Sequence, residues 1–250
     1  MCVTQVGRLG VIIGLLCYAQ LASSQANEVL VVAQFSKESP GTALPDGWRA
    51  HTFKKISRHS EYRLVKDANA VVLQARSNAS ASALAKEISV DPAEYPILEW
   101  SWKVTNLLEN ADLGRKRGDD HPARLYVTFD YDPKQVGIFQ RLKYKILRMI
   151  YGRYPPIGAL NYVWSSKAPA GAMGPNPYTS RVVMVVLESG PEKVGRWVRE
   201  QRNIYEDYKK AFGKDPTKVS GVALMTDTDN TGESATTYYG DIFLKRASPR

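Results

Sequence analysis

Hydrophobic and polar residues alternate with a period of two along much of this chain. The pattern is plainest in LEWSWKV (98–104) and ARLYVTFDYD (123–132). In the second segment Leu125, Val127 and Phe129 are expected to face inward, and the outward face would carry Arg124, Tyr126, Thr128 and Asp130. Such alternation indicates half-buried strands. Further strands are predicted at 29–35, 61–65, 70–77, 81–90 and 181–189, the last apolar on both faces and therefore central.

Two segments break the alternation and are predicted to be helical. Residues 191–212 form one long helix that stops at Gly213, with a core-facing stripe of Val194, Trp197, Val198, Tyr205, Tyr208 and Phe212. Residues 137–152 form a basic amphipathic insertion, closed by Gly152, whose apolar face holds Phe139, Leu142, Ile146, Met149 and Ile150. We expect this insertion to fold down as a lid over the strands; the alternative is a membrane-surface helix over 138–151.

These elements predict a mainly β fold, a sandwich or jelly roll with the two helical segments added. No internal repeat or low-complexity segment stands out, and no linker divides residues 27–250. A chain of this length suits one large β domain with an ordinary hydrophobic core. The sequence therefore predicts a single domain.

The first residues have the layout of a secretory signal peptide. Arg8 precedes an apolar run over 9–21, and Ser24 and Ala26 suit cleavage after residue 26. The run is short for a membrane span, although an uncleaved anchor is the alternative. Cleavage would remove Cys2 and Cys17, so the mature chain would contain no disulfide. We expect a periplasmic or secreted protein.

The charge balance favours acidic partners. The formal net charge is +9, and it becomes +8 once Arg8 is removed. Envelope glycans, other anionic polymers and a membrane surface are candidate partners, while an exported protein is not expected to meet nucleic acid. A basic surface that only keeps the protein soluble is an equally simple interpretation.

Two acidic pairs are the candidates for catalysis. Asp119 and Asp120 precede one predicted strand, and Asp227 and Asp229 follow another. Adjacent aspartates in an extended chain point apart, so a working pair would join one residue from each cluster. Two carboxylates at a suitable separation can cleave a glycosidic bond. The alternative is that one aspartate caps a turn while another pairs with Arg124.

The loop TDTDNTGE (226–233) resembles the first half of a calcium loop. Asp227 and Asp229 alternate as oxygen ligands and Gly232 allows the sharp turn, but Tyr238 stands where an EF-hand needs glutamate. We therefore reject an EF-hand and keep a weaker calcium site at Asp227 and Asp229 as an alternative to a plain turn. No other cofactor is expected, because three histidines without a zinc motif make a zinc site improbable.

A second set of residues suits ligand binding. It comprises Arg124, Tyr126, Asn161 and Trp164. An exposed aromatic ring beside amide and cationic groups would suit a sugar, although buried tryptophan is the ordinary alternative. We therefore expect a non-catalytic module that binds a glycan or an anionic ligand, with a carboxylate-dependent glycan-active enzyme as the alternative.

Several motifs occur together in the order typical of one family. They are LEWSWKV, GDDHPARLYVTFD, LNYVWS, WVREQRNIYEDYKKAFG and MTDTDNTGESATTYYGDI. Between Phe35 and Leu244 the chain resembles the DUF3047 family of exported bacterial proteins, a resemblance that implies no known function. The segments AQFSKESPGTALPDGWRAHTF and YYGDIFL also resemble the first and last parts of galactose-binding-like jelly rolls, which licenses function only by analogy.

Overall fold

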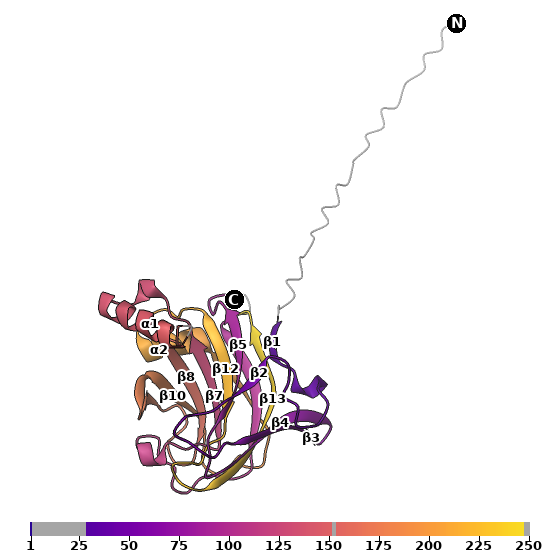
Figure 1. The fold of residues 1–250 in the computed structure, drawn as a ribbon. Helices are drawn as coiled ribbons and strands as arrows, with labels where there is room; N and C mark the ends of the chain where they lie inside the picture. Colours follow the sequence, from indigo (N-terminus) through magenta and orange to yellow (C-terminus); the bar gives the residue numbers. More distant parts are fainter. Residues whose placement is uncertain (2–28, 152–153, 248–250) are drawn as a thin grey trace.

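The structure, a computed structural model, describes residues 29–151 and 154–247 together with Met1. The predicted signal peptide lies outside the described residues. The described chain forms two β-sheets packed face to face (Figure 1). The first sheet has the order β11-β6-β13-β4-β3, with β1 also paired to β13. Its strands are β1 (Val29–Ala33), β3 (Glu61–Asp67), β4 (Ala70–Asn78), β6 (Ile97–Val104), β11 (Val198–Asn203) and β13 (Ser234–Lys245).

The second sheet has the order β2-β5-β12-β7-β8-β10-β9. Only its β8–β10 pair is parallel among the described strand pairs. Its strands are β2 (Trp48–His51), β5 (Ala83–Val90), β7 (Ala123–Phe129), β8 (Gly158–Ser165), β9 (Met173–Asn176), β10 (Thr179–Ser189) and β12 (Val219–Met225). The mainly β, two-sheet prediction is confirmed, while the galactose-binding-like topology stays a prediction.

Alternating side chains from the two sheets meet to form the core. Trp100 and Trp102 on β6 face Tyr162 and Trp164 on β8, with ring centroids 5.4 Å apart for Trp100–Tyr162 and 6.2 Å apart for Trp102–Trp164. Large aromatic side chains bury more apolar area than any others, so these pairs contribute strongly to stability. The predicted inward face of β7, from Leu125 to Phe129, is buried in the same core.

The prediction of one long helix over 191–212 is wrong in its first half. Residues 198–203 form β11, which pairs antiparallel with β6, and α2 spans only Ile204–Phe212. Gly195 has a φ of 78°, a conformation that no α-helix contains, and Asn203 caps α2 by accepting from the Glu206 N–H. The predicted stop is confirmed, since Gly213 ends α2 in the left-handed conformation.

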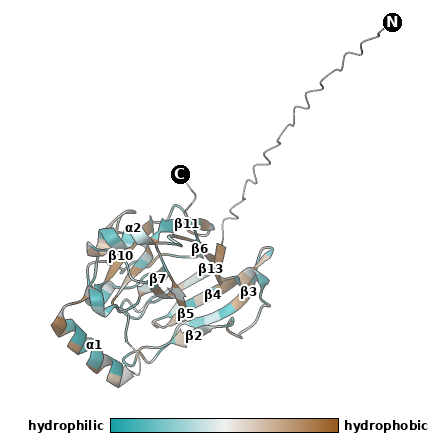
Figure 2. Ribbon diagram, turned by 90° about the horizontal axis from the view of Figure 1, so that it is seen from above, coloured by the Kyte–Doolittle hydropathy of each residue, from teal (hydrophilic) through white to brown (hydrophobic). Residues whose placement is uncertain are grey.

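The predicted helical insertion is confirmed as α1 (Ile138–Tyr151), which connects β7 to β8. The expected lid is wrong, because Phe139, Leu142, Ile146 and Met149 of the predicted apolar face are exposed instead of packed on the sandwich. The side chain of Ile150, the fifth residue of that face, lies outside the described part of the chain. Figure 2 shows α1 set to one side of the two sheets, with polar and apolar residues mixed along it. Within the described residues, no helix has the length and apolar character needed to cross a membrane.

Candidate functional site

The two acidic pairs come together at one end of the second sheet. The loop before β7 carries Asp119 and Asp120, and the loop after β12 carries Asp227 and Asp229. Asp120 accepts hydrogen bonds from the backbone N–H groups of Asn230 and Thr231, which ties the two loops together. The two acidic loops therefore lie side by side, an arrangement that the sequence left open.

Arg124 lies at the centre of this cluster, which we call the Arg124 network. Its guanidinium contacts both oxygens of Asp227, with Nε–Oδ1 and Nη2–Oδ2 distances of 2.7 Å each, and contacts Asp119 Oδ1 at 3.1 Å. The fork of an arginine matches a carboxylate in this bidentate way. Only 1% of the Arg124 surface is exposed, so the charge is stabilised inside the protein.

Three of the four predicted ligand-binding residues are not on the surface. Arg124, Asn161 and Trp164 are at most 1% exposed, and Tyr126 is half-buried beside Arg124. The expected outward exposure of Arg124 is wrong because the two acidic loops fold over the end of β7. Trp164 faces the core, and the Asn161 side-chain amide has no hydrogen-bond partner among the described residues.

Burial also governs the protonation of the network. Burial raises the pKa of the Asp227 carboxyl, and the Arg124 guanidinium opposes that rise. Burial, followed by the charge of Arg124, holds the pKa of His121 well below its ordinary value, so its 3.9 Å approach to Asp119 is not an ion pair. Asp119, Asp120 and Asp227 are at most 5% exposed, which denies a polysaccharide direct contact with these catalytic candidates.

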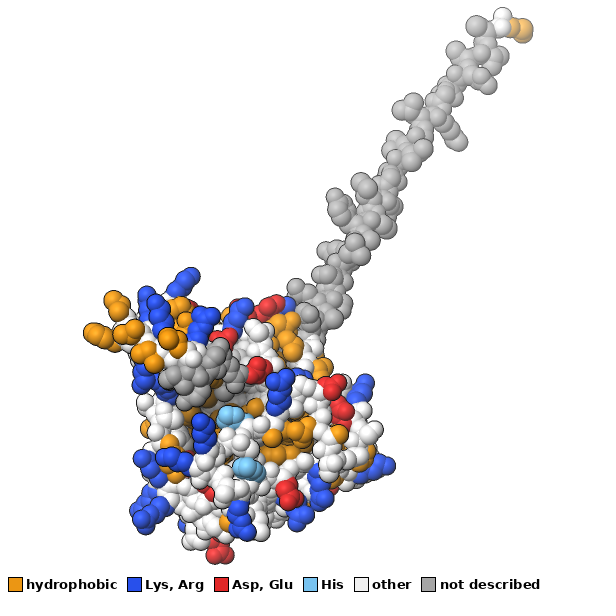
Figure 3. Space-filling view, in the orientation of Figure 1, with side chains coloured by type: hydrophobic (Ala, Val, Ile, Leu, Met, Phe, Trp, Pro, Cys, Tyr) orange, Lys and Arg blue, Asp and Glu red, His pale blue; other side chains and the backbone are white. Residues whose placement is uncertain are grey.

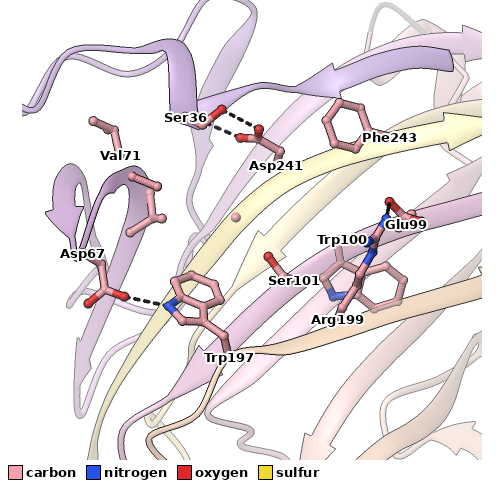
Figure 4. Close-up of a pocket in the computed structure, with 13 residues that line it drawn as sticks. Ser36, Asp67, Val71, Glu99, Trp100, Ser101, Trp197, Arg199, Asp241 and Phe243 are labelled. Atoms are coloured by element: carbon pink, nitrogen blue, oxygen red, sulfur yellow. Dashed lines mark hydrogen bonds and ion pairs between the residues drawn. The ribbon is translucent and has the colours of Figure 1, made fainter.

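An open groove lies over the outer face of the first sheet, lined by residues of β6 and β13 and of the turn before β11. Its volume is about 380 Å³. Figure 4 shows Trp197 and Asp67 at one end, the Glu99–Arg199 pair at the other, and Ser101 between them. A concave surface lined by an aromatic ring and a few polar groups is the usual form of a small-ligand site. We call it the Trp197 groove.

Trp197 is the exposed aromatic side chain of this groove. It stands in the turn before β11 and is 39% exposed. Its Nε1 donates to Asp67 Oδ2 at 2.7 Å, and the Lys103 ammonium lies 5.3 Å from the ring centroid. Lys103 also pairs with Asp67 at 2.6 Å. The indole is therefore held in one orientation, which lowers the entropy lost when a ligand stacks on it.

The middle of the groove depends on a glycine. A Cβ atom added to Gly240 in β13 would clash with Ser101 Oγ, so the Ser101 hydroxyl occupies space that only glycine leaves free. Asp241 follows and accepts from both the backbone N–H and the hydroxyl of Ser36. The two residues lie at an irregularity in the β13–β6 register, between Tyr239 and Ile242. Such bulges commonly redirect side chains at functional sites.

The acidic groups of the groove are hydrogen-bond acceptors at neutral pH. The hydrogen bond from Lys103 holds the pKa of Asp67 below its ordinary value. Burial alone would raise the pKa of Glu99, but Lys245 and Arg199 together hold it below its ordinary value. A general acid needs a raised pKa. Asp67 is therefore suited to accept hydrogen bonds from hydroxyl groups, whereas the buried Glu99 already accepts from Arg199 and Lys245.

A sequence comparison identifies the family. The family model described as "Protein of unknown function (DUF3047)" matches residues 46–243. The chain belongs to the DUF3047 family. The match begins just before β2 and ends near the end of β13. It confirms the resemblance carried by the sequence motifs. No curated protein matches this DUF3047 chain.

Solved structures that match this chain include a carbohydrate-binding module and a xyloglucanase domain. The family 11 carbohydrate-binding module of a cellulosomal cellulase of Clostridium thermocellum has 7% identity and a TM-score of 0.43, covering 90% of this chain and 98% of that one. The xyloglucanase domain of NopAA from Sinorhizobium fredii has 10% identity and a TM-score of 0.43, covering 83% and 98%. At these values the likeness assigns no ligand to the DUF3047 chain.

Sequence reasoning missed Trp197 as a site residue of this DUF3047 protein. The periodicity of the sequence puts this tryptophan on a core-facing helical stripe, whereas in the structure it lies on an exposed turn. The signals that could have found it are Pro191 and Gly195, which favour a turn, and the Asn203–Glu206 spacing of a helix N-terminus.

Calcium binding at Asp227 and Asp229 stays a prediction for the DUF3047 chain. Carboxylate oxygens of Asp120, Asp227 and Asp229 lie within 4.8 Å of one another, although N–H donors already engage Asp120 and Asp227. If calcium binds, millimolar CaCl2 should stabilise the protein by about 1–2 kcal/mol, a few degrees in Tm. EDTA should reverse the shift, and Asp229→Asn should abolish it. If CaCl2 leaves the Tm unchanged, these loops are structural turns and do not bind calcium.

Glu200 supplies a pH-dependent test of β11. Its Oε1 accepts from Trp102 Nε1 at 3.1 Å, and burial, with the nearby charge of Glu188, raises its pKa to about 7. The ionised form is therefore costly in the folded state, and stability falls as the pH rises from the ordinary glutamate value toward 7. Glu200→Gln should stabilise the protein by about 1–2 kcal/mol at pH 8, allowing for partial exposure.

The thermal melt of Glu200→Gln should differ from wild type at pH 8 and match it near pH 4. Glutamine keeps the acceptor for Trp102, so packing is preserved. Glu192→Gln, an exposed change in the turn before β11, is the control and should match wild type at both pH values. Equal Tm values for Glu200→Gln and wild type at pH 8 would contradict the raised pKa.

Proposed function

We propose that this protein is a non-catalytic glycan-binding module whose ligand occupies the Trp197 groove. The observation that carries the proposal is the fixed, partly exposed indole of Trp197 at one end of an open groove about 380 Å³ in volume. The C–H faces of a sugar ring stack on an indole because one surface is apolar while the hydroxyl groups around it remain free to hydrogen-bond.

The polar groups of the groove complement this stacking. Asp67 would accept hydrogen bonds from sugar hydroxyls, and the exposed guanidinium of Arg199, which the buried Glu99 holds in place, would donate them. Each of these charges already has a partner of opposite sign, since Lys103 pairs with Asp67 and Arg199 pairs with Glu99. A groove without surplus positive charge favours a neutral glycan over an anionic polymer, despite the basic character of the whole chain.

The protonation of Asp67 and Glu99 supports binding without turnover. The lowered pKa values of Asp67 and Glu99 leave neither as a proton donor at neutral pH. The catalytic candidates at residues 119, 120 and 227 are buried in the Arg124 network. Glycoside hydrolysis needs one carboxylic acid and one carboxylate beside the scissile bond. Their burial and the lowered pKa values support the binding proposal over the enzyme alternative.

The experiment is a binding survey with a turnover control. The protein is run in native gels containing neutral polysaccharides (β-glucan, xylan, mannan) or anionic ones (alginate, polygalacturonate), and positive ligands are titrated by calorimetry. We expect retention by at least one neutral polysaccharide, with a Kd of roughly 100 μM or −5.5 kcal/mol. Retention only by anionic polymers, or the release of new reducing ends, would contradict the proposal.

Export is proposed as the context of this binding. Residues 1–26 have the composition of a signal peptide, so the glycan would be met in the periplasm or outside the cell. Mass spectrometry of the protein recovered from a bacterial periplasm should give an N-terminus at Asn27. A cytoplasmic protein that retains Met1 would contradict export while leaving the groove unaffected.

A further inference from the structure

Among the described side chains of helix α1, Tyr144 anchors the helix to the sandwich. Tyr144 is 2% exposed and stacks on Tyr131 with ring centroids 4.1 Å apart. The Tyr144 hydroxyl donates to the backbone carbonyl of Pro156, and the Arg181 guanidinium lies 5.4 Å from the same ring. This contact fixes which side of α1 faces the body of the protein.

The opposite side of α1 is apolar and exposed. The exposed fractions are 79% for Ile138, 91% for Phe139, 59% for Leu142, 51% for Ile146 and 86% for Met149. Successive helical residues are about 100° apart, so these five side chains share an arc of about 100° that lies opposite Tyr144. Single exposed apolar residues are ordinary, but a contiguous stripe marks an interaction surface.

Positive charge accompanies the apolar stripe. The helix contains four basic residues and no acidic one: Arg141, Lys143, Lys145 and Arg148. Lys143 and Lys145 fall on the two sides of the stripe in the helical projection. Figure 3 shows basic side chains beside the hydrophobic groups of α1, which project from the molecule. Apolar side chains between lysines are the composition of helices that lie at a membrane interface.

We propose that α1 docks this protein on a membrane surface rich in anionic phospholipid, with the helix axis parallel to the surface and the stripe inserted among the acyl chains. Charge selects this partner over a second copy of the chain, because two α1 helices would bring like charges together. Lysine side chains near the surface would contact the lipid phosphates while their stems follow the apolar boundary. The inference does not rest on glycan binding.

The test is co-sedimentation of the full chain with vesicles. Wild type should bind vesicles of equal parts phosphatidylglycerol and phosphatidylcholine, bind pure phosphatidylcholine weakly, and be released by high salt. Phe139→Gln with Met149→Gln removes the two most exposed apolar groups, and Lys143→Glu with Lys145→Glu reverses the flanking charges. Each pair of substitutions should lower the partition coefficient at least about tenfold.

Two controls make the result specific to α1. Lys54→Glu with Lys55→Glu makes the same change in net charge on the exposed segment after β2 and should leave vesicle binding unchanged. Every variant retains residues 1–26, so any binding by that segment is common to all. Thermal melting should be unchanged in the Phe139/Met149 variant, because both side chains are largely exposed.

Three outcomes would overturn the membrane proposal. The first is that the wild-type protein does not co-sediment with anionic vesicles. The second is that the α1 variants bind vesicles as wild type does. The third is a dimer, seen by light scattering, that the Phe139/Met149 variant abolishes without any vesicle binding, since a second copy would then cover the stripe. Trp197→Ala serves to separate the two proposals, because it should weaken glycan binding and leave vesicle binding intact.

Discussion

Replacing Arg124 by methionine is expected to lower the free energy of unfolding by about 3–5 kcal/mol, or about 10 °C or more in Tm. The guanidinium is 1% exposed and makes two hydrogen bonds to Asp227 and one to Asp119 Oδ1. Without it the carboxylate of Asp227 would remain buried without a counter-charge. Leaving a buried charge unpaired costs more than the pair contributed.

The pH dependence of this loss has a definite sign. Arg124 opposes the burial that raises the pKa of Asp227, so its removal raises that pKa further. In the variant, Asp227 can then become protonated at low pH, which removes part of the free-energy cost of a buried, unpaired carboxylate. Urea unfolding should show a smaller difference between Arg124→Met and wild type at pH 5 than at pH 8.

Arg199→Met is the matched control for Arg124→Met. Arg199 also pairs with a carboxylate, that of Glu99, but its side chain is 71% exposed. An exposed pair contributes about 0–1 kcal/mol. Adding Asp227→Leu to Arg124→Met should recover part of the stability, because the unpaired Asp227 carboxylate is then absent. If Arg124→Met is no less stable than Arg199→Met, the Arg124 network does not support the fold.

Replacing Trp197 by alanine is expected to lower the affinity for the neutral glycan identified in the survey at least about tenfold, or 1.4 kcal/mol. The indole offers the exposed aromatic surface of the groove, and its Nε1 fixes Asp67 at the same end. Removing it takes away the stacking surface and loosens one acceptor. Calorimetric titration of the same polysaccharide with wild type and variant measures the change.

The fold should tolerate this change, because Asp67 keeps its 2.6 Å contact with Lys103. Trp197→Phe should retain part of the affinity, since a smaller ring still stacks. Phe139→Ala is the control, being an exposed aromatic residue on α1, outside the groove. Unchanged affinity in Trp197→Ala at an unchanged Tm would place the glycan site elsewhere on the protein.

Most strands of this fold could be predicted from the chain because period-two alternation depends only on which face is buried. The predicted strands over 61–65, 70–77 and 181–189 correspond to β3, β4 and β10. The spacing of apolar residues gave the wrong element at residues 198–203, where pairing with β6 outweighed a helical pattern. Helix propensity differs little between ordinary residues, so six ladder positions decide the outcome.

The site was partly predictable for a different reason. Asp and Gly in turns mark loops, so the sequence indicated two acidic loops. Whether the two loops meet depends on how the strands pair, which the sequence left open. The burial of Arg124 could not be inferred from β7, because alternation says which face a side chain takes and nothing of what covers that face. In this protein a loop closes over it through Gly118, where a Cβ would lie only 2.7 Å from the Asp112 nitrogen.

The position of α1 between two paired strands has a consequence for protein engineering. Phe129, the last residue of β7, lies directly opposite Gly158, the first residue of β8, so the strand ends already stand at hairpin distance. A short turn could therefore join the two strands directly. Such a turn, or a foreign segment grafted between the same strand ends, would replace α1 and would remove the stacking of Tyr144 on Tyr131.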